Sequence, residues 1–309
     1  MVIELKGLNL DGFPLSALAA YGLTRLLNKM GYQAELGFID AATRPHAYLK
    51  LEENAVIRDT ESLSEVLAEH VRNTGIEDKG LFRGLTELKE LAKSKVPGTS
   101  NSEFYLAYIN KVPGAKGEVR TIKTPFDTTK GQQRFPKMLE STINLLKKRS
   151  TRAKKAFIKA FYETVLLIPN DPLSIEFKEP IPRIGWHPSQ FRRTADQARI
   201  ANQENERKTI RLNPAAVFLA WEAIPLYPFV PGTKVPLGFT KESNTLWLFL
   251  PTPARSVNLT FLKTLVALAP SLKDRAPDLP IWRSWRVGSL ALGDDYPCFL
   301  EAHPARSAT

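Results

Sequence analysis

Residues 116–160 read KGEVRTIKTPFDTTKGQQRFPKMLESTINLLKKRSTRAKKAFIKA, and this stretch is the most informative part of the sequence for function. It contains thirteen Lys and Arg against three acidic residues, a local charge of +10 in a chain whose net charge is +11. Residues 1–115 carry −2, from thirteen basic and fifteen acidic residues, and residues 161–309 carry +3. The excess positive charge is therefore concentrated in one segment, which is typical of a surface that meets a polyanion.

The second half of this stretch has the periodicity of an amphipathic helix. Apolar residues recur at the three-and-four spacing of a buried helical face: Ala153, Ala156, Phe157, Ala160 and Phe161. On a continuous helix, the opposite face carries a basic stripe that we expect to contact phosphates: Lys148, Arg152, Lys155 and Lys159. Two alternatives stay open. Ser150 or Thr151 caps a new helix and splits the stripe, or the bases form an ordinary solvated helix face.

Composition limits the class of protein. The chain has 309 residues and 43% hydrophobic content, enough for a substantial core in one large domain or two smaller ones. It has no apolar run of the length that a membrane span needs, and its start lacks the shape of a signal peptide. The single cysteine, Cys298, fits a reducing compartment. We expect a cytoplasmic protein with no membrane partner, and nucleic acid is the favoured polyanion.

The fold class predicted from the sequence is α+β. Residues 1–115 are expected to form a mixed α/β N-terminal portion, with strands at 2–10, 34–40 and 46–52 and helices at 15–30, 62–73 and 81–95. Residues 116–168 are expected to form a basic helical segment. Proline-rich stretches at 96–117 and 169–188 mark the limits of these portions.

Residues 169–309 are expected to form an α+β C-terminal portion. The pattern predicts helices at 189–205 and 214–223 and a β-hairpin around residues 241–244. It also predicts a helix in 256–270 that Pro270 closes, and a strand-like pair in WRSWRVGSLAL at residues 282–292. The sequence contains no internal repeat.

Catalytic signatures are missing from the sequence. The four histidines, His46, His70, His187 and His303, lie far apart, and none has a second His or Cys at the spacing of a zinc site. The acidic pair Asp294–Asp295 follows a glycine, as in an ordinary turn. No glycine-rich phosphate loop occurs. We therefore expect a protein that is not an enzyme, without a metal site and without a cofactor.

Two polar clusters have residue types that hold nucleic acid. In TTKGQQRF, a glycine lets backbone amides approach phosphate beside Lys130, Gln132, Gln133 and Arg134, and Lys123 precedes them in the basic segment. In PSQFRRTADQAR, arginine forks and amides suit base edges: Gln190, Arg192, Arg193 and Arg199, followed by Asn202, Gln203, Lys208 and Arg211. The alternatives are a capped helix start for the first cluster and an exposed polar helix for the second.

A third cluster interleaves aromatic and basic residues. Trp282, Arg283, Trp285 and Arg286 alternate as in grooves that bind single strands, where bases stack on aromatic rings. The same alternation is also typical of a half-buried strand, which is the favoured alternative.

Five blocks of the sequence resemble one protein family. They are LKGLNLDGFPLSALAAYGLTRLL at 5–27, TPFDTTKGQQRFPKMLE at 124–140, GWHPSQFRRTADQAR at 185–199, NPAAVFLAWEAIPLYPF at 213–229 and WRSWRVGSLALGDDYPCF at 282–299. In this order they resemble the large-subunit-type proteins of type I CRISPR interference (Cascade) complexes, in particular those of the I-U, also called I-G, systems.

The resemblance implies a non-catalytic subunit of an RNA-guided assembly. Such a subunit recognises a short motif beside the target, stabilises the opened DNA and leaves cutting to a recruited helicase-nuclease. The implied partners are guide RNA, target DNA, and the backbone and other Cascade subunits. The alternatives are a basic scaffold or RNA-binding protein without contact to target DNA, and, less favoured, a nuclease.

Overall fold

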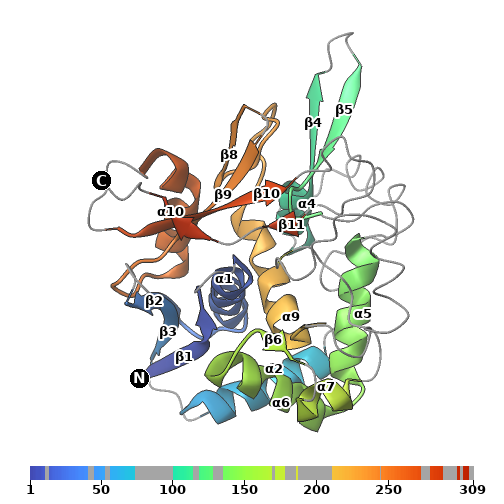
Figure 1. Cartoon of the computed structure of the whole chain (residues 1–309), viewed down its shortest axis with the longest axis vertical. Helices are drawn as coiled ribbons and strands as arrows, with labels where there is room; N and C mark the ends of the chain where they lie inside the picture. Colours follow the sequence, from blue (N-terminus) through green and yellow to red (C-terminus); the bar gives the residue numbers. More distant parts are fainter. Residues whose placement is uncertain are drawn as a thin grey trace.

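The computed structural model describes residues 1–10, 14–40, 45–52, 56–73, 100–113, 118–127, 135–168, 171–177, 186, 211–243, 245–272, 279–287, 298–299 and 302–305. The fold combines helices with antiparallel strands that form several small sheets (Figure 1), so the predicted α+β class is confirmed. Within these ranges, no helix combines the length and the hydropathy needed to cross a membrane.

The N-terminal sheet has three antiparallel strands, in the order β1 (Val2–Asn9), β3 (His46–Leu51), β2 (Ala34–Ile39). The alternation of apolar and polar residues in β1 buries one face and exposes the other. The outer edge of β2 is covered by the chain around residue 257, because Leu36 and Val257 exchange two backbone hydrogen bonds of 2.9 Å each. These strands were predicted within one or two residues.

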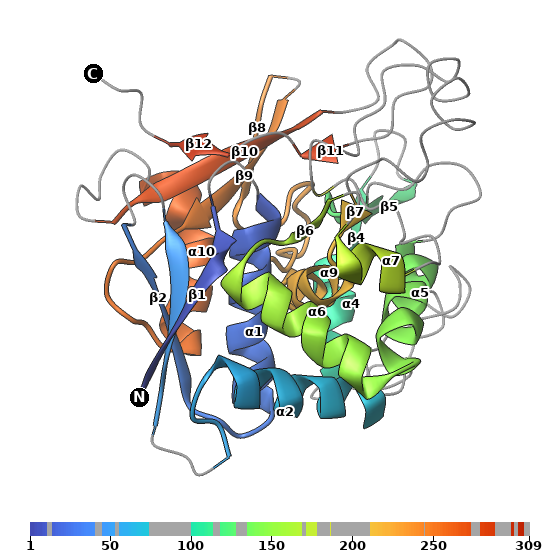
Figure 2. The same cartoon turned by 60° about the horizontal axis from the view of Figure 1, so that its bottom comes forward.

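Helix α1 (Pro14–Lys29) lies at the centre of the molecule (Figure 2) and is buried on all sides from Pro14 to Leu27. Its main partner is α9 (Pro214–Glu222), which is also buried along its whole length. The two helices approach closely at Gly22, where an added Cβ would lie 1.7 Å from the carbonyl oxygen of Leu219. Glycine is therefore required at the crossing.

Four helices form a further layer of the fold. Its helices are α2 (Thr60–Asn73), α5 (Phe135–Lys147), α6 (Ser150–Tyr162) and the short α7 (Pro172–Glu176). Helix α6 packs on β1 and α2, and the apolar face predicted for it is buried as expected. Asn213 joins this layer to α9: its side chain caps α9 at the Ala215 amide, 2.9 Å away, and donates to the carbonyl of Ala156 at 2.9 Å.

The C-terminal sheet has β10 (Ile281–Val287) at its centre. Antiparallel to it lie β9 (Thr245–Pro251), β11 (Cys298–Phe299) and β12 (His303–Pro304), and β8 (Phe239–Glu242) pairs with β9. The predicted hairpin around residues 241–244 is the β8–β9 pair. Helix α10 (Leu259–Leu272) continues through Pro270, so the predicted end at this proline is wrong. A proline in the last turn removes only one helical hydrogen bond, which the helix tolerates.

Shorter elements connect these layers. Helix α4 (Ser100–Tyr108) leads directly into β4 (Ile109–Pro113), which pairs with β5 (Val119–Lys123) in a separate two-stranded sheet. A second small pair joins β6 (Leu166–Leu167) to β7 (Arg211–Leu212), and the 3₁₀ helix η3 (Ile224–Leu226) follows α9. The middle segment therefore begins with a strand, although the sequence predicted it as helical.

One hydrophobic cluster contains residues from all three predicted portions of the chain, for example Leu5, Phe157 and Trp221. The portions share a core, and the predicted limits at residues 115 and 168 stay predictions. The helices predicted at 81–95 and 189–205 lie outside the described residues.

Candidate nucleic-acid interface

The basic stripe does not run along one continuous helix. Helix α5 ends at Lys147, and α6 starts at Ser150 after an extended N-cap residue, Arg149, with φ −153° and ψ 124°. No side chain caps α6. The predicted split of the stripe is therefore confirmed, and Lys148 lies outside the helix that carries Arg152, Lys155 and Lys159. The predicted cap by Ser150 or Thr151 is wrong, because Arg149 is the N-cap residue.

Lys159 is a structural residue. Its side chain is only 11% exposed, and its Nζ contacts the carboxylates of Asp171, at 2.6 Å, and Glu163. Burial acts to lower the pKa of Lys159, but hydrogen bonds to the two carboxylates outweigh it and raise the pKa. Conversely, burial acts to raise the pKa of Asp171, and the bond from Lys159 holds it below its usual range. The charge of Lys159 is therefore neutralised inside the protein, and its contact with phosphate stays a prediction.

The other two helical members of the stripe also have partners within the chain. Lys155 forms an ion pair with Glu176 of α7 and remains 60% exposed, and the guanidinium of Arg152 lies 5.3 Å from the centre of the Phe177 ring. On the neighbouring face, Lys154 binds Glu61 and Glu65 of α2, and these hydrogen bonds raise the pKa of Lys154. The expected face of uncompensated charge on α6 is therefore absent from this described helix.

Lys123 also contacts an acid of the same chain. Its Nζ lies 3.4 Å from Oδ2 of Asp127, whose side chain is only 4% exposed, and the Tyr108 hydroxyl donates to the same oxygen at 3.2 Å. Lys123 itself is 48% exposed. It therefore holds the base of β5 in place while part of its surface faces solvent.

Several predicted residues fall outside the described part of the chain. These are both central clusters: Lys130, Gln132, Gln133 and Arg134, and Gln190, Arg192, Arg193 and Arg199, together with Asn202, Gln203 and Lys208. Their roles stay predictions. Arg211 is described, and it donates to the carbonyl oxygens of Phe177, at 2.8 Å, and Ser174. Arg211 thus fastens α7 instead of presenting its guanidinium to a base.

The aromatic and basic cluster forms part of the C-terminal sheet. Trp282 is 7% exposed in β10, and the guanidinium of Arg283 lies 4.5 Å from the centre of the Trp247 ring on β9. The half-buried strand, the favoured alternative, therefore describes this cluster. The side chains of Trp285 and Arg286 lie outside the described part.

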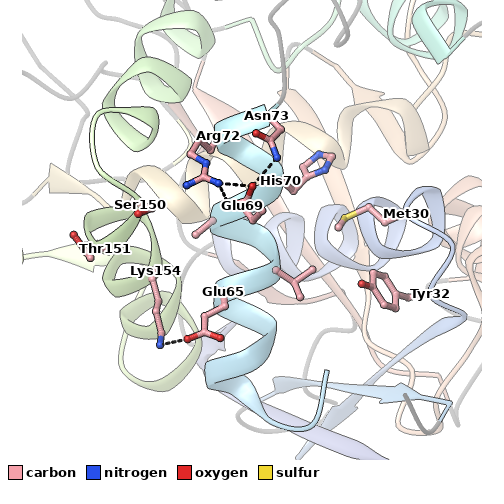
Figure 3. Close-up of a pocket in the computed structure, with 12 residues that line it drawn as sticks. Met30, Tyr32, Glu65, Glu69, His70, Arg72, Asn73, Ser150, Thr151 and Lys154 are labelled. Atoms are coloured by element: carbon pink, nitrogen blue, oxygen red, sulfur yellow. Dashed lines mark hydrogen bonds and ion pairs between the residues drawn. The ribbon is translucent and has the colours of Figure 1, made fainter. Parts of the chain in front are cut away.

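A hollow of about 690 Å³ opens between the end of α1, helix α2 and the start of α6 (Figure 3). Acidic and basic groups line it together. Glu69 accepts hydrogen bonds from Arg72 and Asn73, which lower the pKa of Glu69, and Lys154 binds Glu65. Because these charges neutralise one another, the hollow does not have the single sign of charge that attracts a polyanion.

Three consecutive basic residues lie at the α5–α6 turn. We call Lys147, Lys148 and Arg149 the basic junction. Lys148 and Arg149 are exposed and Lys147 is half-buried. Within the described part of the chain, the structure gives the side chains of Lys147 and Arg149 no ion pair. The run KKR marks this site in the sequence, but the prediction followed the helical spacing of the stripe and favoured the face of the helix.

A buried ion cluster was not predicted. Arg25 of α1 is 1% exposed and contacts two carboxylates, Glu222 of α9 at 2.7 Å and Glu103 of α4 at 2.6 Å. Glu103 also lies 3.6 Å from the Nζ of Lys263 on α10. The only signal in the sequence is a single arginine among the apolar residues of α1.

No three His, Cys, Asp or Glu side chains of the described residues gather as ligands for a metal ion. No protein-family model, curated protein or solved structure matches the chain.

Proposed function

We propose that the chain is a non-catalytic, nucleic-acid-binding subunit of an RNA-guided CRISPR interference complex. In this role it binds beside guide RNA and other Cascade subunits, recognises a motif adjacent to the target, stabilises the opened DNA and leaves cutting to a recruited helicase-nuclease. The observation that carries the proposal is the charge distribution, with +10 of a net +11 within residues 116–160. The sequence resemblance supplies the type of complex.

The basic junction is the described part of this segment that best suits phosphate contacts. The Lys148 and Arg149 side chains are exposed at this turn. Each basic group that neutralises a phosphate releases condensed counterions, and binding then weakens as salt rises. Three junction residues account for at most about 2.7 units of the slope of log affinity against log salt on duplex DNA.

The test is the triple variant Lys147→Ala, Lys148→Ala and Arg149→Ala. We expect weaker binding to duplex DNA in fluorescence anisotropy and a salt slope reduced by up to about 2.7 units. A matched control removes the same charge from three exposed residues of the C-terminal portion, Lys234, Lys241 and Arg255. The control should keep the wild-type slope.

Two results would contradict the proposal. If the purified wild-type chain binds neither DNA nor RNA, the nucleic-acid role fails. If it binds structured RNA and ignores a library of duplexes with randomised flanks, the protein is an RNA-binding scaffold without contact to target DNA. A preference among the flanking sequences is the result that we expect for recognition of an adjacent motif.

A further inference from the structure

The C-terminal sheet has an outer face on which side chains from four strands line up. The register places Thr240 of β8 opposite Trp247 of β9, and it places Arg283 of β10 between Phe249 of β9 and His303 of β12. Because directly opposite residues point to the same side of a sheet, these five side chains share one face. The other face carries the leucines of β9 and packs on the main core. In Figure 2 the sheet lies along one margin of the molecule.

Only part of this outer face is covered. Phe249 is fully buried in a small hydrophobic cluster that includes Ala269 of α10. Trp247 and Arg283 are half-buried, and His303 is exposed. The uncovered part of the face therefore combines an aromatic ring with a guanidinium and an imidazole.

Arg283 carries a charge that no described carboxylate neutralises. Its guanidinium lies 4.5 Å from the centre of the Trp247 ring, and among the described residues the structure gives this side chain no ion pair and no hydrogen bond. The hydroxyl oxygen of Thr240, on the strand beside Trp247, is buried and has no hydrogen-bond partner within the described part of the chain. A guanidinium has five N–H donors in a planar fork, so its edge remains available to an anion. The charge of this face therefore complements a phosphate.

We propose that the outer face of the C-terminal sheet binds single-stranded nucleic acid, with a base stacked on the Trp247–Arg283 pair and a neighbouring phosphate bound by the guanidinium edge. Unpaired bases stack on aromatic rings and on guanidinium planes, whereas a duplex hides the faces of its bases. An acidic peptide would also satisfy the charge, but its carboxylates do not stack on the ring. The inference rests on the proposed function and deepens it, because it assigns the contact with the opened DNA to this face.

The size of the face limits the contact to a short stretch of the strand. The strands lie in the order β8, β9, β10, β12, so Thr240 and His303 flank the Trp247–Arg283 pair on its two sides. At the usual spacing between strands, this row spans about 14 Å, which a few nucleotides cover.

The test measures binding of an oligo-dT strand to the full chain by fluorescence anisotropy. Trp247→Leu removes the stacking ring, and we expect at least about fivefold weaker binding with an unchanged salt slope. Arg283→Gln removes one phosphate contact, and we expect the slope of log affinity against log salt to fall by about 0.7, the value for one phosphate of a single strand. Trp247→Phe keeps a ring and should bind within about threefold of wild type. A residue that only supports the fold would not separate affinity from salt slope in this way.

A photochemical crosslink locates the strand on the wild-type protein, independently of any variant. Irradiation of the complex should attach thymine to the tryptic peptide of residues 242–255, in which Trp247 is the only tryptophan. The control variant Lys234→Gln with Phe261→Leu removes an exposed lysine and an exposed aromatic ring elsewhere and should bind as wild type. Circular dichroism melts verify that each variant is folded at the assay temperature.

Each contrary outcome has a distinct meaning. If the wild type binds duplex DNA but ignores oligo-dT, or if oligo-dT crosslinks only outside residues 242–255, the inference is overturned and the proposed function stands. Unchanged affinity and salt slope in both single variants also overturn it. Binding of a polyglutamate peptide that depends on Arg283, without binding of oligo-dT, overturns it as well, because the face would then dock an acidic protein. A wild type that binds no nucleic acid overturns both the inference and the proposed function.

Discussion

Replacing Arg25 with Met is expected to destabilise the protein strongly. The Arg25 guanidinium lies 2.7 Å from the Glu222 carboxylate, and both side chains are only 1% exposed. Removing one member of a buried ion pair leaves an uncompensated charge and costs roughly 3–5 kcal/mol. Glu103 adds less, because it is 42% exposed and lies near Lys263. The expected loss is a large share of the roughly 5–15 kcal/mol that stabilises a typical native protein.

The measurement is urea unfolding followed by circular dichroism, with thermal unfolding as a second readout. A loss of 3–5 kcal/mol corresponds to a melting temperature about 5–8 °C lower for a chain of this length. The double variant Arg25→Met and Glu222→Leu should recover much of the loss, because it removes both buried charges. Glu103→Gln is the matched control at the exposed side of the same cluster and should cost about 1 kcal/mol or less.

The reasoning on Arg25 would be refuted by two results. One is a loss below about 1 kcal/mol in the single Arg25 variant, which would mean that the Glu222 carboxylate is satisfied without the guanidinium. The other is a double variant whose loss equals the sum of the two single losses, because two residues in direct contact should show coupling.

Three further changes are expected to report on the packing of the helices. Gly22→Ala should lower the free energy of unfolding by about 3 kcal/mol or more, since its Cβ would collide with the Leu219 carbonyl; an unchanged urea midpoint would contradict the close crossing. Asn213→Ala should cost about 2–4 kcal/mol, because a buried cap and the bond to α6 are lost together; Asn213→Asp should recover the cap alone. Lys159→Met should make the free energy of unfolding fall less steeply between pH 7 and pH 3, as measured by urea titration at each pH. The lowered pKa of Asp171 gives wild type a contribution present above about pH 4 and lost below it, and a variant with the wild-type acid slope would exclude this pair as its source.

Local patterns predicted most of the regular structure. Strand β1, helix α1 and the β8–β9 hairpin follow from alternation, from three-and-four periodicity and from turn residues, all of which act between near neighbours in the sequence. Pro270 was misread because the effect of a proline depends on its distance from the helix end, and the sequence does not fix that end.

The candidate interface was harder to predict because compensation of charge is a long-range property. The acids that engage Lys154 lie about ninety residues earlier, in α2, and Asp171 follows Lys159 only after the chain has turned at β6. Counting acids at helical spacing finds Glu163, four residues after Lys159, but neither of these more distant groups. The burial of Arg25 was missed for the same reason, since its partner Glu222 belongs to a helix 197 residues away in the sequence.

The pairing of α1 with α9 has a consequence during synthesis. Helix α1 is buried on every side in the folded protein, and its main partner α9 emerges from the ribosome almost two hundred residues later. At about 5–20 residues per second, the apolar surface of α1 stays uncovered in the nascent chain for roughly 10–40 s. During that interval the unfinished polypeptide is a natural client for chaperones, and N-terminal fragments that stop before α9 should accumulate as aggregates.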